Sequence, residues 1–349
     1  MASQVKNTAW LEWIAGLMGL ESRQTHTATL PAGQFHCLLD ELPLHLIPQR
    51  HVEFSNVALG LSNQPLFFNP RCSLLSGGEV PEELESHRDL LQSFCLQGTV
   101  AWVKDYATNS LSPFWLSPRL EAIVSSLCKG DIVSSSLPED LIRLLTTAGI
   151  LTREGDAERR ISEWNEIVKK SARQFRETGY AAIGNLIHPF NLAALRRYFR
   201  HVVRQRAISL GDEQCPLRYG VHNDRVAQFF HHQIAKPLAA IVGEAIKPSY
   251  VYSASYLSGA ELKKHIDREQ CEFSVTLCLD FSPEPKGATS WPIRLDTAEG
   301  TATVYQALGD GLLYRGPRLP HYRNVLGEGH MSTSIFFHYV AADFSGPLD

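Results

Sequence analysis

The sequence predicts an α+β protein in which helices precede an antiparallel barrel or jelly roll. Two features support this fold class. Between residues 161 and 245 the apolar residues recur mainly at helical spacing, whereas beyond Pro248 the segments alternate and are rich in β-branched and aromatic residues. Helices that come first and strands that follow favour a domain with an antiparallel sheet and flanking helices.

A charged stretch at residues 153–160 separates two apolar parts of the chain and is the predicted domain boundary. At 349 residues the chain is longer than a single hydrophobic core usually supports, which favours two domains. We therefore expect an accessory domain at residues 1–155 and a second, larger domain at residues 156–349.

Residues 1–155 are expected to form a smaller helical, winged-helix-like domain. Ser117 is followed by a proline, which is typical of an N-cap and a first helical residue. Ser136 and Glu139 have the spacing of a capping box before a second helix. A short strand is predicted at 150–152, and two helices followed by a strand suggest a winged-helix-like unit.

The expected elements of the C-terminal domain follow from periodicity and from turn residues. The predicted helices are 161–176, 192–203 and 226–245. The predicted strands are 180–187, 250–257, 273–281, 302–306, 311–314 and 332–340.

Composition and charge argue against several classes of protein. The net charge is -4 and no run of Lys and Arg occurs, so we expect no nucleic-acid partner. The apolar stretch at 10–20 contains Glu12 and is too short to span a bilayer, so we expect neither a signal peptide nor a membrane partner. The 7 cysteines are scattered and form no C-x-x-C, which argues against a disulfide framework or zinc ribbon and favours a cytoplasmic location.

The chemistry is predicted to lie at the motif His265-x-Asp267. In an extended chain, residues i and i+2 point to the same side, so a nitrogen and an oxygen ligand can reach one metal ion from one strand end. His321 follows a turn and a strand at 309–314 and supplies the third ligand. Two histidines and one carboxylate leave three positions open, which is typical of non-haem Fe(II) sites.

A second H-x-D motif begins at His222 and has to be weighed against the first. We interpret it as part of a polar loop without a preceding strand, whereas His265 is flanked by strands. This context favours His265 as the metal ligand and makes His222 a loop or substrate-side residue. Packing rather than ligation is expected of His231, His232 and His338.

An opening helix, a strand at 179–180 and the segment Y-x-x-G-x-x-L-x-x-H-x-D that ends at Asp267 occur in this order. In this layout residues 173–341 resemble the prolyl-hydroxylase-like branch of the Fe(II)/2-oxoglutarate-dependent dioxygenases. The resemblance implies a double-stranded β-helix that binds Fe(II) and uses 2-oxoglutarate and O2 as cosubstrates. The ligands it implies are His265, Asp267 and His321.

The distal carboxylate of 2-oxoglutarate needs a cation, because an anion in an apolar barrel must be paired. The resemblance implies an arginine about nine residues beyond the distal histidine, but His330 stands there. Arg323 would face the same side as His321 on an extended strand, and only guanidinium gives a permanently charged fork. We therefore prefer Arg323, with His330 and Lys263 as alternatives, while a surface salt bridge is the other role open to Arg323.

Three further residues are candidates for hydrogen bonds to the cosubstrate. Tyr252 and Tyr256 alternate on the strand before the metal motif, and Thr276 lies on the strand after it. A second role stays open for each of them, because tyrosines also line barrels and a threonine also fills a strand.

The expected reaction is C–H hydroxylation coupled to oxidative decarboxylation of 2-oxoglutarate, with desaturation or cyclisation as other outcomes. Asp267 keeps the carboxylate ligand, so no position is opened for a halide. The expected substrate is a peptide or protein, or a small natural product. Residues 115–152 are similar to the peptide-binding winged helices that accompany enzymes modifying ribosomal peptides, so the N-terminal domain is expected to recruit substrate.

Two other functions stay open at this point. One is a binding or sensor protein with a degenerate barrel, and the other is an iron enzyme that does not use 2-oxoglutarate.

Overall fold

The computed structural model describes residues 33–42, 44–47, 65–205 and 208–349, which divide into two compact units. Unit 1 includes residues 93–161 and 189–197, and unit 2 includes residues 162–188 and 198–349. The predicted boundary at 155 precedes this division, which falls inside helix α6 (Asp156–Thr178). The stretch at 10–20 considered as a signal peptide lies outside the described residues.

Unit 1 contains two antiparallel sheets and two longer helices. The three-stranded sheet has the order β2 (Cys72–Leu75), β3 (Thr99–Lys104), β4 (Leu111–Leu116). The two-stranded sheet pairs β1 (Leu66–Phe68) with β5 (Leu151–Arg153). The described helices that lie wholly in unit 1 are α3 (Glu82–Glu85), α4 (Pro118–Lys129) and α5 (Glu139–Thr147), and unit 1 also includes the start of α6 and residues 189–197 of α7 (Pro189–Arg204).

The two helix starts predicted in unit 1 have different outcomes. Ser117 caps α4 as predicted, because its Oγ accepts a hydrogen bond from Leu120 N at 3.3 Å. Ser136 does not cap α5. Its hydroxyl donates to Val133 O at 2.7 Å, and Pro138 occupies the N-cap without a side-chain hydrogen bond.

The expectation of a smaller helical, winged-helix-like N-terminal domain did not include the strands at 72–75, 99–104 and 111–116. Five of the six residues of β3 are buried, so this strand has no alternation of apolar and polar residues. Strands buried on both faces lack the period of two that sequence analysis relies on. A winged helix in this unit stays a prediction.

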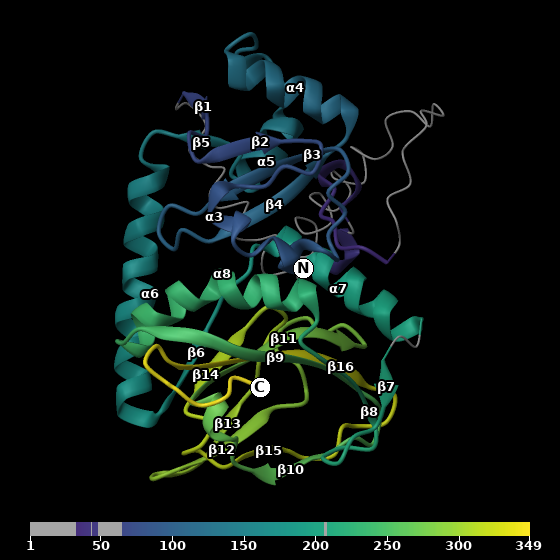
Figure 1. The fold of residues 1–349 in the computed structure, drawn as a ribbon, viewed down its shortest axis with the longest axis vertical. Coiled ribbons are helices and arrows are strands. Elements are labelled where there is room, and N and C mark those ends of the chain that lie inside the picture. Colours follow the sequence, from purple (N-terminus) through teal and green to yellow (C-terminus); the bar gives the residue numbers. More distant parts are fainter. Residues whose placement is uncertain (1–32, 43, 48–64, 206–207) are drawn as a thin grey trace, which may run out of the picture. The chain divides into compact units, whose positions relative to one another are not determined.

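Unit 2 contains the two antiparallel sheets expected of a jelly roll (Figure 1). The larger sheet has the order β6 (Tyr180–Ile183), β14 (Gly311–Tyr314), β11 (Phe273–Ser282), β16 (Met331–Ala341), β9 (Ile246–Tyr256), β8 (Arg218–His222), β7 (Ser209–Leu210). The smaller sheet has the order β10 (Leu262–His265), β15 (His321–Arg323), β12 (Ile293–Thr297), β13 (Gly300–Val304). The prediction of antiparallel sheets after a helical region is confirmed.

The predicted helices of the C-terminal half are present as α6, α7 (Pro189–Arg204) and α8 (Arg225–Val242). Helix α8 packs on the larger sheet, where Tyr339 Oη of β16 donates to the carbonyl of His231 at 2.9 Å. The 3-10 helices of the described residues are η1 (Leu39–Glu41), η2 (Leu44–Leu46), η3 (Arg88–Leu91), η4 (Ser134–Ser136) and η5 (Glu269–Cys271).

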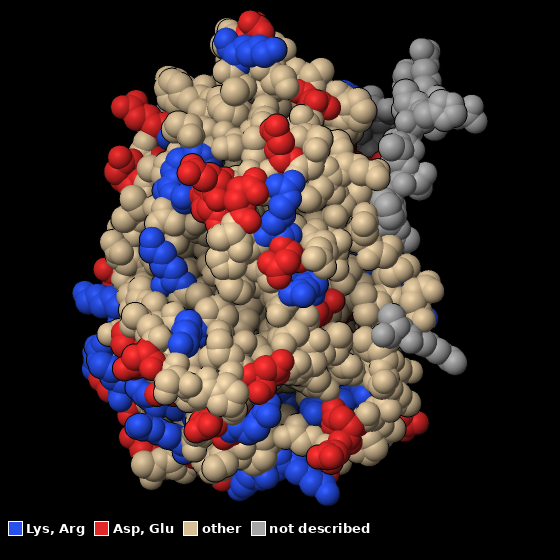
Figure 2. All heavy atoms as spheres, viewed as in Figure 1, with Lys and Arg blue, Asp and Glu red and all other residues tan. Residues whose placement is uncertain are grey.

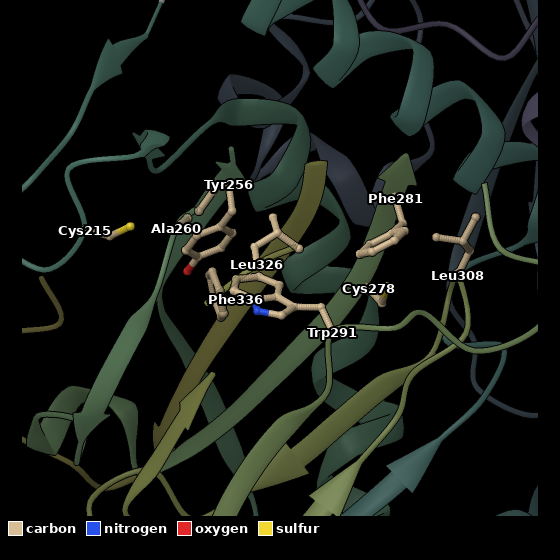
Figure 3. Close-up of a cluster of buried hydrophobic side chains, with 10 residues drawn as sticks. Cys215, Tyr256, Ala260, Cys278, Phe281, Trp291, Leu308, Leu326 and Phe336 are labelled. Atoms are coloured by element: carbon tan, nitrogen blue, oxygen red, sulfur yellow. The ribbon is translucent and has the colours of Figure 1, made fainter. Parts of the chain in front are cut away.

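A buried hydrophobic cluster lies between the two sheets of unit 2 (Figure 3). Tyr256 and Phe336 contribute to it from the larger sheet, and Trp291 and Leu326 contribute from beside strands of the smaller sheet. The rings of Tyr256 and Trp291 meet edge to face at 5.0 Å between centroids. This packing holds the sheets together and fixes the side chains that form one wall of the cavity described below.

Lys and Arg side chains are interspersed with Asp and Glu over the face shown in Figure 2. This mixed pattern accompanies the net charge of -4. Within the described part of the chain, no helix combines the length and the apolar character needed to cross a bilayer.

Candidate active site

Three predicted ligand residues meet where β10 and β15 lie side by side. His265 ends β10 and His321 begins β15, and the two are direct partners in the antiparallel register. Asp267 Oδ1 lies 3.7 Å from Nε2 of His265 and 3.5 Å from Nε2 of His321. The three side chains each offer a ligand atom, and these atoms lie within 4.8 Å of one another.

Both histidines have the tautomer that a metal ligand needs. Nδ1 of His265 lies 2.8 Å from Lys263 O, and Nδ1 of His321 lies 2.9 Å from Leu319 O. A carbonyl can only accept, so each Nδ1 carries the proton and each Nε2 keeps its lone pair. Burial, followed by the charge of His321, lowers the pKa of His265, which keeps this imidazole neutral at pH 7.

The carboxylate of Asp267 is held in one orientation. Burial alone would raise the pKa of Asp267, but the adjacent His321, the charge of His338 and the hydrogen bond from Ser274 lower it to about 2. Its backbone N–H donates to Gly316 O at 3.1 Å. A Cβ at Gly316 would lie 2.5 Å from Asp267 Oδ2 and closer still to Cys271 O, so only glycine fits here. Asp267 is therefore an ionised, fixed oxygen donor, and the three residues fit a divalent cation.

A cavity of about 390 Å³ opens beside these three residues. Strands β9 and β16 of the larger sheet contribute Tyr250, Tyr252, Tyr256, Phe336 and His338 to its lining. The aromatic residues alternate along each strand, as expected where one strand face lines a barrel.

Arg323 is buried inside the barrel without a carboxylate partner. It forms no ion pair with any acid among the described residues. Its guanidinium donates to Trp291 O at 2.5 Å and to Gln306 Oε1 at 3.1 Å, stacks 4.7 Å from the Trp291 ring, and leaves Nε without a partner. A surface salt bridge, the other role considered for Arg323, is therefore wrong. Arg323 does not itself line the cavity, but burial lowers its pKa while Tyr256 and Tyr314, which line the cavity, raise it.

The other candidates for cosubstrate binding are placed differently. Tyr252 and Tyr256 line the cavity, whereas Thr276 is buried behind it with its Oγ1 3.4 Å from Tyr314 Oη. His330 and Lys263 lie outside the cavity lining. His330 bonds to Glu328 O at 2.9 Å, and Lys263 is exposed.

The interpretation of His222 as a loop residue without a preceding strand is wrong, because His222 ends β8. Its H-x-D partner Asp224 instead caps α8, with Oδ1 accepting from Ala227 N at 3.0 Å. His222 Nε2 lies 3.2 Å from Asp349 Oδ1, and its ring stacks on Tyr250 at 4.9 Å. His222 lines the cavity, and its role on the substrate side stays a prediction.

Sequence analysis did not identify two residues that line the cavity. Arg218 of β8 donates from Nε to Asp212 Oδ2 at 2.6 Å and from Nη1 to Tyr256 Oη at 3.1 Å. Tyr314 ends β14, and its hydroxyl lies 3.4 Å from His321 Nε2. Both positions follow from strand pairing, and only recognition of β8 and of the inward face of β14 would have revealed them.

No family model and no curated protein matches this chain. Solved structures do. The chain is similar in structure to 2-oxoglutarate-dependent oxygenases. The non-haem α-ketoglutarate-dependent epimerase SnoN from nogalamycin biosynthesis is 12% identical with a TM-score of 0.44, covering 51% of this chain and 84% of its own. A prolyl-4-hydroxylase from Pseudomonas putida is 15% identical with a TM-score of 0.40, covering 49% of this chain and 98% of its own.

AviO1 from Streptomyces viridochromogenes is 20% identical with a TM-score of 0.41, covering 51% of this chain and 97% of its own. Because these sequence identities and TM-scores are low, the function proposed below rests on the side chains of this chain.

Proposed function

We propose that this chain is a non-haem Fe(II) oxygenase that couples oxidative decarboxylation of 2-oxoglutarate to C–H hydroxylation of a bound substrate. The observation that carries this proposal is the convergence of His265 Nε2, Asp267 Oδ1 and His321 Nε2 beside a cavity. Two imidazoles and one carboxylate form the facial donor set that suits Fe(II). When bound, Fe(II) supplies the activation of O2 by which 2-oxoglutarate is oxidised to succinate and CO2.

Arg323 is proposed to bind the distal carboxylate of 2-oxoglutarate. A buried guanidinium that lacks an anion is costly, and its Nε has no partner, so part of its hydrogen-bonding capacity is unused. Ser334 Oγ is another buried atom without a partner, and Ser334 lies directly across from Cys278 in the strand register. A carboxylate beside these groups would satisfy both.

Arg218 is a second candidate for the same role, because it lines the cavity directly. Its guanidinium is already paired with Asp212 and hydrogen-bonded to Tyr256 and Gln214. This pairing favours Arg323, whose charge has no counterion among the described residues.

The substrate is proposed to be a small natural product or a side chain of a peptide or protein. A cavity of about 390 Å³ is in the range of small-molecule sites, which run from roughly 300 to 1,000 Å³. Residues 1–155 are proposed to contribute affinity for a substrate of peptide type. Desaturation and cyclisation use the same donor set, so the reaction outcome is a separate question for product analysis.

The test is an anaerobic Fe(II) titration combined with an assay of succinate formation in air. We expect about one Fe(II) per chain, as one facial site requires. Replacement of a ligand, as in His265→Ala or His321→Ala, should abolish Fe(II) binding, whereas His222→Ala should retain it. Iron binding without succinate would instead support a sensor, and substrate oxidation without succinate would support an iron enzyme that does not use 2-oxoglutarate.

A further inference from the structure

The two oxygens of the Asp267 carboxylate have different surroundings. Oδ1 faces Nε2 of both ligand histidines, at 3.7 and 3.5 Å. Oδ2 accepts a hydrogen bond from Ser274 Oγ at 2.9 Å. Ser274 lies on β11 and is fully buried, so water does not compete for this hydrogen bond. One oxygen is thus free for a metal ion while the other is held by the protein.

His338 fixes the direction of the Ser274 hydrogen bond. Nδ1 of His338 lies 2.9 Å from Ser274 Oγ. A carboxylate only accepts, so the single hydroxyl proton of Ser274 goes to Asp267, and Ser274 Oγ accepts from Nδ1–H of His338. A longer contact joins Ser274 Oγ to Cys271 O at 3.3 Å. The two hydrogen bonds therefore run in one direction, from His338 to Ser274 and from Ser274 to Asp267.

The imidazole of His338 is itself firmly placed. His338 is buried on β16, directly across from Ser274 in the strand register. Its ring packs against Tyr250 at 4.6 Å between centroids, and its backbone carbonyl contacts His231 Nε2 of α8 at 2.7 Å. Because the sheet, the Tyr250 ring and helix α8 fix the position of His338, His338 can in turn orient Ser274.

We propose that Ser274 and His338 are positioning residues that restrict Asp267 to one-oxygen ligation and thereby keep a coordination position open. The inference rests on the proposed function. A metal ion with six positions and three protein ligand atoms retains three, which a chelating 2-oxoglutarate and O2 require. If Oδ2 were released, the carboxylate could turn and bind through both oxygens, which would close one of these positions.

Asp267, Cys271 and His338 also form a cluster that could hold a metal ion. One contact argues against this use, because Cys271 Sγ lies 3.1 Å from Tyr250 Oη. Burial raises the pKa of Cys271 to about 12, which further disfavours a thiolate. His338 therefore acts on Asp267 through Ser274.

The test uses Co(II) as the probe with the full chain, because Co(II) reports its ligands through its visible absorption. Ser274→Ala should weaken Co(II) binding roughly 10- to 100-fold, as loss of a partner hydrogen-bonded to a metal ligand usually does. It should also change the Co(II) spectrum and weaken 2-oxoglutarate binding to the Co(II) form. Ser253→Ala is the matched control, since Ser253 is a buried strand serine whose Oγ has no partner.

Two further variants separate positioning from folding. Ser274→Thr keeps the hydroxyl and should restore most of the affinity and the spectrum, and His338→Leu should reproduce the spectral change of Ser274→Ala. The melting temperature of each metal-free variant is measured alongside, and should Ser274→Ala not fold, His338→Leu carries the same comparison.

The proposal is overturned if Ser274→Ala matches Ser253→Ala in Co(II) affinity and spectrum. It is also overturned if His338→Leu abolishes Co(II) binding as fully as His265→Ala, because His338 would then be a ligand. A wild-type chain that binds no Co(II) would overturn the proposed function itself, and this inference with it.

Discussion

At the scale of single residues, Arg323 differs from the other arginines near the cavity in having a buried charge and no acid beside it. Arg218 has Asp212, whereas Arg323 has a carbonyl, an amide and an indole ring. A buried charge of this kind is less costly where a ligand pairs with it, so a variant of Arg323 can test binding of 2-oxoglutarate separately from binding of metal.

Arg323→Ala should raise the apparent KM for 2-oxoglutarate roughly ten- to a hundredfold, since a hydrogen bond to a charged group is worth about 1.5–3 kcal/mol. Fe(II) binding should change little. Succinate formation measured over a range of 2-oxoglutarate concentrations checks this. His330→Ala is the comparison variant, because Nδ1 of His330 already bonds to Glu328 O, whereas Nε of Arg323 has no partner. If Arg218→Ala raised the KM for 2-oxoglutarate more than Arg323→Ala, then Arg218 of β8 would be the residue that binds the distal carboxylate.

Gly316 is a second residue whose role follows from distances alone. A Cβ at this position would lie 2.5 Å from Asp267 Oδ2, so Gly316→Ala must displace the carboxylate or the backbone. We expect the free energy of unfolding to fall by about 1–3 kcal/mol and the Fe(II) affinity to fall with it. Chemical denaturation and an Fe(II) titration measure the two effects.

Gly287→Ala serves as the comparison for Gly316→Ala. No atom lies within 4 Å of a Cβ built at Gly287. A Gly316→Ala variant that binds Fe(II) as tightly as Gly287→Ala would show that the loop containing Gly316 shifts without displacing the Asp267 carboxylate.

At the scale of elements, the position of the candidate metal centre was predictable because strand geometry is local. Residues i and i+2 of an extended segment share a side, and this rule alone brought His265 and Asp267 together. The pairing of His265 with His321 was not predictable from spacing. Strands β10 and β15 have only four and three residues, too few for periodicity to be recognised.

Strand β8 shows why Arg218 was missed. Its sequence R-Y-G-V-H contains Gly220, and glycine weakens the signal of a strand. A Cβ at Gly220 would lie 1.8 Å from Tyr252 Oη, so glycine is required there by a tyrosine on the neighbouring strand. A single sequence does not reveal such a contact between distant segments, and the strand and its arginine were both overlooked.

The long strands were predicted well for the converse reason. Strands β9, β11 and β16 have 11, 10 and 11 residues, enough for β-branched and aromatic residues to stand out. Turn residues delimited β14 at the bounds that were predicted.

Helices α4 and α5 allow a test of capping within one unit. Ser117→Ala should lower the free energy of unfolding by about 1 kcal/mol, because Ser117 Oγ caps α4 and also bonds to Asp40. Ser136→Ala should change it by less than about 0.5 kcal/mol, since Ser136 makes only an exposed hydrogen bond to Val133 O. Urea denaturation of both variants measures the difference. Equal effects would contradict the assignment of the cap to Ser117 alone.

At the scale of the whole molecule, the two units are not two separate lengths of chain. Residues 189–197 of α7 belong to unit 1, although they follow residues 162–188 of unit 2 in the sequence. Asn191 donates to Pro113 O at 2.9 Å, and Arg197 donates to His36 O at 2.7 Å. The chain thus returns to unit 1 after the first strand of unit 2, which the prediction of a single boundary did not anticipate.

Because residues 189–197 belong to unit 1, the choice of fragment determines whether substrate recruitment by residues 1–155 can be tested. A single domain boundary at residue 155 would make residues 156–349 the natural fragment for this test. In the structure, Phe190, Leu192 and Leu195 of α7 are buried and belong to unit 1, and the ring of Phe190 packs against Phe114 of β4. The fragment would expose all three and remove the partners of Asn191, Arg196 and Arg197.

We therefore expect residues 156–349 alone to aggregate or to melt well below the full chain. Each large apolar side chain moved into water costs about 1.5–3 kcal/mol, and three of them approach the 5–15 kcal/mol that stabilises a typical domain. Size-exclusion chromatography, circular dichroism and a Co(II) titration, with the full chain as control, check this. A fragment that is monomeric, melts within a few degrees of the full chain and binds Co(II) would contradict the expectation. It would also show that the barrel unit folds alone, and only then would weaker turnover of a peptide substrate by the fragment measure recruitment by residues 1–155.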